Sequence, residues 1–80
     1  TKPMDVQVIF FGSIIDITLV DSVLLNNCTD LDSIVNDLIE RYPSLANKKY
    51  FIAVNQKMVH ENIKLKMGDT VALMPPFSGG

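Results

Sequence analysis

The chain has 80 residues, which is room for one domain with one modest hydrophobic core and leaves no room for a separate catalytic domain. Of these residues 48% are hydrophobic and 20% are charged, a balance typical of a folded globular domain and not of a disordered tail. The net charge is −2, and the single Cys28 and single His60 exclude an intrachain disulfide and a metal centre built from several such ligands.

The sequence also bears on where the protein acts. No apolar run approaches the roughly 20 residues of a membrane span, and residues 1–3 lack the layout of a signal peptide. We therefore expect a cytoplasmic protein without a membrane partner. Residues 41–80 hold six basic residues, and the five lysines among them fall in predicted turns and short strands. We expect solvated loops and no nucleic-acid partner, and the alternative is a patch that docks a partner.

The first predicted element is a β-strand over residues 4–11. One alternating set of side chains, which we expect to face the core, is Val6, Val8 and Phe10. The other set is Gln7, Ile9 and Phe11. This second set is also largely apolar, so the strand is covered on both faces or its outer face meets a partner. Residues 14–25 are predicted as a second strand that forms a hairpin with the first.

A helix is predicted at about residues 30–42, where the hydrophobic period changes from that of a strand to that of a helix. The apolar side chains at helical spacing are Leu31, Ile34, Val35, Leu38, Ile39 and Tyr42. Thr29 is the predicted N-cap, with Asp32 completing an arrangement similar to a capping box. Pro43 ends the helix, because the residue before a proline is disfavoured in helical geometry.

Three further strands are predicted in the second half of the chain. Residues 50–54 and 57–59 are joined by a tight turn, and residues 70–74 form the last strand. Leu65 is expected to contribute to the core from an irregular segment. The predicted fold class is thus α+β, with a mixed sheet of four to five strands packed on one main helix in a domain spanning residues 1–74.

Some single residues invite a functional interpretation beside a structural one. Cys28 is expected to be a small, partly buried apolar side chain, and the alternative is a persulfide relay. His60 is expected in an exposed turn beside Glu61. Three methionines are expected to fill the core, and the alternative is a binding surface; they are Met58, Met67 and Met74.

The last six residues, 75–80, are predicted to form an extended tail. They are Pro75, Pro76, Phe77, Ser78, Gly79 and Gly80. The prolines fix φ and remove two backbone donors, and the paired glycines present no side chain to a narrow channel, so the tail suits insertion into another protein. The carboxylate of Gly80 is a poor electrophile and needs activation by a partner that uses ATP. A frayed end without function is the structural alternative.

Four segments carry a resemblance to a known family. They are Val-Ile-Phe-Phe-Gly at 8–12, Glu-Arg-Tyr-Pro at 40–43, Ile-Ala-Val-Asn at 52–55, and Gly-Asp-Thr-Val-Ala-Leu-Met-Pro-Pro-Phe-Ser-Gly-Gly at 68–80. Across essentially its whole length the chain resembles the small subunits of molybdopterin synthase, which are ubiquitin-like (β-grasp) sulfur carriers of the MoaD/ThiS family.

This resemblance implies a function for the tail. Gly80 would be adenylated by an enzyme similar to ubiquitin-activating enzymes, converted to a thiocarboxylate, and would donate sulfur to cyclic pyranopterin monophosphate in molybdenum cofactor biosynthesis. Residues 75–79 would be the stalk inserted into the large synthase subunit, although the family often has a smaller aliphatic residue at the position of Phe77. The small subunit would bind no cofactor, with catalysis in the large subunit of a heterotetramer and ATP used by the activating partner.

Three other functions stay open. The chain is also similar to sulfur carriers of the thiamine pathway, which share the Gly-Gly end but typically lack the two prolines. A protein modifier joined through Gly80 to lysines is a second alternative. A β-grasp interaction module with an inert tail is a third.

Overall fold

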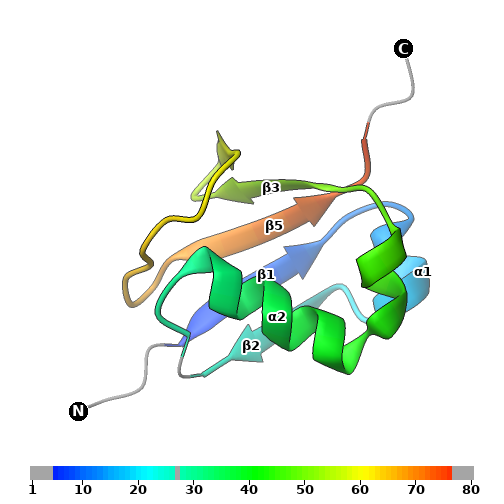
Figure 1. The fold of residues 1–80 in the computed structure, drawn as a ribbon, viewed down its shortest axis with the longest axis horizontal. Coiled ribbons are helices and arrows are strands. Elements are labelled where there is room, and N and C mark those ends of the chain that lie inside the picture. The colour runs from blue at the N-terminus through cyan, green and yellow to red at the C-terminus, as the bar shows by residue number, and fades with distance from the viewer. Residues whose placement is uncertain (1–4, 27, 77–80) are drawn as a thin grey trace.

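The computed structural model in Figure 1 describes residues 5–26 and 28–76 and shows one sheet crossed on one face by a helix. The sheet has five strands in the order β2-β1-β5-β3-β4. The strands are β1 (Val6–Phe10), β2 (Ser22–Leu25), β3 (Phe51–Val54), β4 (Lys57–Val59) and β5 (Thr70–Met74). The helices are α1 (Ile14–Thr18), α2 (Leu31–Arg41) and the 3-10 helix η1 (Pro43–Asn47). The predicted α+β class is confirmed.

The sheet is mixed, with β5 as its central strand. β5 pairs in parallel with β1, with Phe10 opposite Leu73, and antiparallel with β3, with Phe51 opposite Met74. β1 pairs antiparallel with β2, and β3 with β4. Because β1 and β5 are parallel neighbours, their C-terminal ends lie side by side.

The first strand shows the predicted alternation, since its inward set is at most 1% exposed. In the outward set Ile9 is half-buried and Phe11 is 47% exposed. The prediction that β1 is covered on both faces is therefore wrong for the part of the chain that the structure describes. The alternative, an outer face that meets a partner, is taken up below.

The predicted second strand over residues 14–25 is wrong in its first half. Residues 14–18 form the short helix α1, and only residues 22–25 form β2, which does pair with β1. β-branched residues in this segment favour a strand by local propensity. One helical turn instead places Ile14 and Thr18 on the same side, where both are buried.

The N-cap of the main helix α2 lies one residue later than predicted. Its N-cap is Asp30, whose side chain accepts a hydrogen bond from Ser33 N at 3.0 Å, while Ser33 Oγ accepts one from Asp30 N at 3.3 Å. This reciprocal pair is a capping box, and the predicted cap at Thr29 is wrong. The side chain of Asn62 supports the same end by accepting from Asp32 N at 2.8 Å.

The second half follows the prediction closely. Asn55 and Gln56 have φ of 50° and 72°, the left-handed pair that a two-residue turn of type I′ requires between β3 and β4. Asn55 also links this turn to β5, because its side-chain oxygen accepts from Thr70 N and its amide donates to Asp69. Asp69 accepts a further bond from Lys66 N at 2.8 Å, so two turns are held together.

The core lies between the sheet and the helices. Its buried side chains are Val6, Val8, Phe10, Ile14, Leu25, Cys28, Leu31, Ile34, Leu38, Leu45, Val54, Leu65, Val71 and Leu73. Burying one such aliphatic or aromatic side chain stabilises the fold by about 1.5–3 kcal/mol. Leu65 is in the core as predicted, but the methionine prediction is wrong, since Met58 is 48% and Met67 63% exposed.

Within the described residues, no helix combines the length and the apolar character that crossing a membrane requires. The same residues contain no group of three or more His, Cys, Asp or Glu side chains placed to hold a metal ion.

The two candidate caps of α2 can be distinguished experimentally. We expect Asp30→Ala to lower the urea midpoint of unfolding, because the backbone N–H of Ser33 loses its acceptor. Thr29→Ala is the matched control, and we expect it to change the midpoint little. Equal losses from the two variants would contradict the assignment of Asp30 as the cap.

The Asp69 network predicts a loss of stability in acid. The hydrogen bond from Asn55, followed by that from the Lys66 backbone, lowers the pKa of Asp69 below its ordinary value. A lowered folded-state pKa contributes stability above the ordinary pKa, and this is lost as the pH falls from about 5 through the folded-state pKa. Asp69→Asn should therefore show a weaker dependence of urea stability on pH over that range. An unchanged dependence would rule out this contribution.

Candidate functional site

The predicted tail starts at the C-terminal end of the central strand β5. β5 ends at Met74, beside the end of β1 and the start of β3 (Figure 1). Pro75 follows as a half-buried residue, and Pro76 is exposed. Phe77, Ser78, Gly79 and Gly80 lie outside the described residues, so their predicted roles stay predictions, as does the division into a domain and a tail.

Two consecutive prolines explain why β5 stops where it does. Neither ring nitrogen carries a hydrogen, so neither residue can donate to a neighbouring strand. β5 has partners on both sides, β1 and β3, and a proline in such a central strand leaves a donor missing from the ladder. The chain therefore leaves the sheet at Pro75.

Beside this point lies the face of the sheet that α2 does not cover, called here the outer face. It is formed by alternate residues of the five strands: Gln7, Ile9, Ser22, Leu24, Phe51, Ala53, Met58, Thr70, Ala72 and Met74. None of these described strand residues carries a charge. Phe11 extends the face directly after β1. Seven of the ten strand residues are apolar, and exposed apolar side chains gathered on one face are typical of a protein–protein interface.

The outer face is hollowed at its centre. Ala53 of β3 lies opposite Ala72 of β5, and these two small side chains leave a depression of about 630 Å³. The larger apolar side chains around the depression are Ile9, Phe11, Met58 and Met74. An apolar side chain of a partner can fill such a space and remove the half-exposed Phe11 and Met58 from water.

The outer face was only partly visible in the sequence. The apolar second set of β1, with Ile9 and Phe11, gave the signal that a partner could meet this face. Met58 and Met74 were instead assigned to the core. Their strands are short, and alternation over three to five residues does not say which face is buried.

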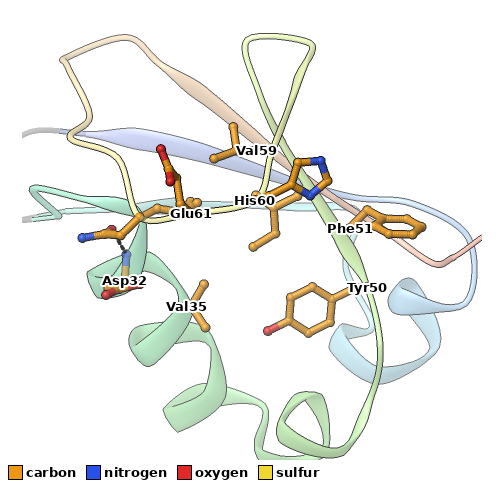
Figure 2. A pocket seen from close by; sticks show the side chains of 10 residues that line it. Asp32, Val35, Tyr50, Phe51, Val59, His60 and Glu61 are labelled. Atoms are coloured by element: carbon orange, nitrogen blue, oxygen red, sulfur yellow. Dashed lines mark hydrogen bonds between the residues drawn. The ribbon is translucent and has the colours of Figure 1, made fainter.

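A second depression, of about 410 Å³, lies on the helix side of the sheet between α2 and the strands β3 and β4. Figure 2 shows Val35 and Tyr50 pointing into this space, with His60 and Glu61 from the segment after β4 at its rim. Both rim residues are exposed, as predicted for His60.

Among the described residues that line it, this depression shows no arrangement typical of a catalytic site. Within the part of the chain that the structure describes, no hydrogen bond joins any two of His60, Glu61 and Tyr50. No two of them therefore form a nucleophile–base pair. Burial raises the pKa of Tyr50, which keeps its phenol protonated. The depression is also on the other side of the sheet from the outer face. We assign it no role.

The burial and position of Cys28 argue against a role as a sulfur relay. It is 3% exposed, and burial, followed by the charge of Asp37, raises the pKa of its thiol, so the reactive thiolate is disfavoured. Cys28 follows β2, whose Leu25 pairs with Val6 at the start of β1. Pro75 follows the opposite ends of the parallel strands. The geometry supports the structural interpretation of Cys28.

Comparison with known proteins gives concordant matches. A model of the ThiS family matches residues 8–80. The molybdopterin synthase sulfur carrier subunit of Mycobacterium tuberculosis is 34% identical over 80 residues, covering 94% of this chain and 96% of that protein.

Solved structures agree. A complex of subunits 1 and 2 of the molybdopterin-converting factor from Helicobacter pylori matches with a TM-score of 0.73 and 29% identity, covering 96% of this chain and 100% of the matched one. Small archaeal modifier protein 1 from Methanosarcina acetivorans matches with a TM-score of 0.83 and 18% identity, covering all of both chains, which bears on the fold alone. The ubiquitin-like β-grasp fold is confirmed. The match of the family model, together with 34% identity along nearly all of a relative, shows that the chain belongs to the ThiS family.

Proposed function

We propose that the protein is the sulfur-carrier subunit of a molybdopterin synthase, with the carboxyl group of Gly80 as the carrier. The observation that carries this proposal is the exit of the tail beside an uncharged, apolar outer face with a central hollow. Family membership and the name of the 34% identical relative support the same function. The domain docks through the outer face, and the tail then enters the partner's site.

The chemistry proposed for Gly80 needs two partner-catalysed steps. The carboxylate attacks the α-phosphate of ATP, releasing pyrophosphate and giving an acyl adenylate. A hydrosulfide ion supplied by a partner then attacks the carbonyl carbon, AMP leaves, and the thioacid that forms loses its proton to give a thiocarboxylate. This chain contributes delivery, because its small tail residues let the carbonyl approach a buried site, while the partner supplies the catalytic groups.

The final acceptor in this proposal is cyclic pyranopterin monophosphate, which receives the sulfur in a site of the large subunit. The Helicobacter pylori structure contains subunits 1 and 2 of a molybdopterin-converting factor, and this supports a large-subunit partner here. An assembly of two small and two large subunits, an activating enzyme that resembles ubiquitin-activating enzymes, and a cytoplasmic location complete the proposal.

The thiamine pathway is the alternative within the same family. The relative and the two-subunit complex both favour molybdopterin synthesis over it. A pull-down distinguishes the two, since we expect recovery of a large synthase subunit, and recovery of a thiazole synthase would reverse the assignment.

Formation of the thiocarboxylate can be tested by intact-mass spectrometry. After incubation with the activating enzyme, ATP and a sulfur donor, we expect the mass increase of one oxygen exchanged for sulfur, located at Gly80 by fragmentation. A chain lacking residues 79–80 is the control and should not change. The absence of any shift in the full chain would exclude the carrier function, and isopeptide-linked Gly-Gly remnants on lysines would favour a protein modifier.

Docking through the outer face can be tested with a matched pair of exposed methionines. Met58→Asp places a carboxylate at the rim of the hollow, and we expect roughly tenfold or greater weakening of the affinity for the large subunit, because an unpaired charge would be desolvated. Met67→Asp introduces the same charge at a 63% exposed position that does not line the hollow, and should bind normally. Equal affinities for the two variants would contradict docking through this face.

A further inference from the structure

The turn after β1 lies against the first residue of the tail. Because β1 and β5 run in parallel and end together, the turn at Gly12 and the exit at Pro75 come from the same edge of the sheet (Figure 1). Phe11 N donates a hydrogen bond to Leu73 O at 3.0 Å, which holds the turn against the end of β5.

The approach of Pro75 to Gly12 leaves no room for a side chain at residue 12 unless the proline ring shifts. A Cβ built on Gly12 would lie 2.9 Å from Pro75 Cγ and 3.3 Å from Pro75 Cδ. The pyrrolidine ring therefore rests on the bare Cα of Gly12. Gly12 also has φ of +58°, in the left-handed region that glycine adopts without steric cost.

The Gly12 side of this contact is fixed. Gly12 O accepts a hydrogen bond from Ile15 N at 3.1 Å, which ties the turn to the start of α1. α1 is in turn anchored by Ile14 and Thr18, which are 1% and 4% exposed. Pro75, by contrast, has no N–H with which a neighbouring strand could hold it. The direction in which the chain leaves the sheet at Pro75 therefore depends on the packing of the proline ring.

We propose that Gly12 is a positioning residue for the tail: its bare Cα seats the ring of Pro75 and sets the direction in which the tail leaves the sheet. This proposal rests on the proposed function of the tail. An extended chain spans about 3.4 Å per residue, so a change of about 20° at Pro75 would move the end of a five-residue extension by about 6 Å. A displacement of about 1 Å at a reacting group can cost about 100-fold in rate.

Two glycine variants separate this role from backbone strain. Gly12→Ala adds a methyl group against Pro75 at a positive φ. Gly68→Ala is the matched control, because Gly68 has φ of +87° and a Cβ built on it would meet no neighbouring atom within 4 Å. Both variants carry the strain of a left-handed alanine, and only the first displaces the proline. Urea unfolding of each variant measures the loss of stability that this backbone strain causes.

For Gly12→Ala we expect kcat for sulfur transfer with the large subunit to fall roughly tenfold or more. The apparent KM, set mainly by the outer face, should stay within about twofold. Gly68→Ala should keep both parameters near those of the unmodified chain. A loss of kcat in Gly68→Ala equal to that in Gly12→Ala, or no loss in either, overturns the proposal.

A double-mutant cycle tests whether the effect passes through the ring. Pro75→Ala removes the two atoms that the new methyl group would strike, so Gly12→Ala combined with Pro75→Ala should be no slower than Pro75→Ala alone, within about twofold. If the two losses instead multiply, Gly12 does not act through Pro75 and the proposal is wrong.

An independent readout keeps this proposal separate from the function of the tail. In NMR spectra of the isolated chain, nuclear Overhauser contacts between the Gly12 Hα atoms and the Pro75 ring should be present in the unmodified chain and in Gly68→Ala. They should be lost or weakened in Gly12→Ala, and unchanged contacts there would overturn the proposal. If the unmodified chain never acquires sulfur, the proposed function fails, whereas these contacts still decide the positioning of Pro75.

Discussion

The pairing of β5 with β1 on one side and β3 on the other determines most of what the domain presents. The inward residues Val71 and Leu73 are fully buried in the core, and the outward Ala72 forms the floor of the hollow together with Ala53. The same strand then continues into Pro75. One strand thus contributes to the hydrophobic core and to the outer face and leads to the start of the predicted tail, so their relative placement depends on the register of its two ladders.

Elements with a strong local pattern could be predicted from the sequence, and those decided by distant contacts could not. The stripe of α2 and the alternation predicted over residues 4–11 repeat often enough to be read along the chain. α1 has only five residues, and its helical state depends on burial of Ile14 and Thr18. Thr29 and Asp30 are both good caps by residue type. The segment after β4 determines which of them is the cap. There Ile63 O accepts a hydrogen bond from Leu31 N, and the side chain of Asn62 accepts one from Asp32 N.

The candidate site was predictable to a similar extent. Two prolines and two glycines lie within the last six residues, and their effects on backbone geometry are local, so a projecting tail is a prediction that needs no structure; for residues 77–80 it stays a prediction. The hollow could not, because Ala53 and Ala72 are far apart in the sequence and meet only through the register of β3 and β5. The seat of Pro75 on Gly12 has the same origin in the parallel pairing of β1 and β5.

The central position of β5 also affects how the domain responds to mechanical load. A partner that grips the tail pulls β5 along its own axis, and the backbone hydrogen bonds to β1 and β3 then share the load in shear. A tail attached to an edge strand such as β4 would instead load one ladder, on one side only. A pulling load applied beyond β5 is therefore carried by two ladders, so the domain resists it better than it would if a single ladder carried the load.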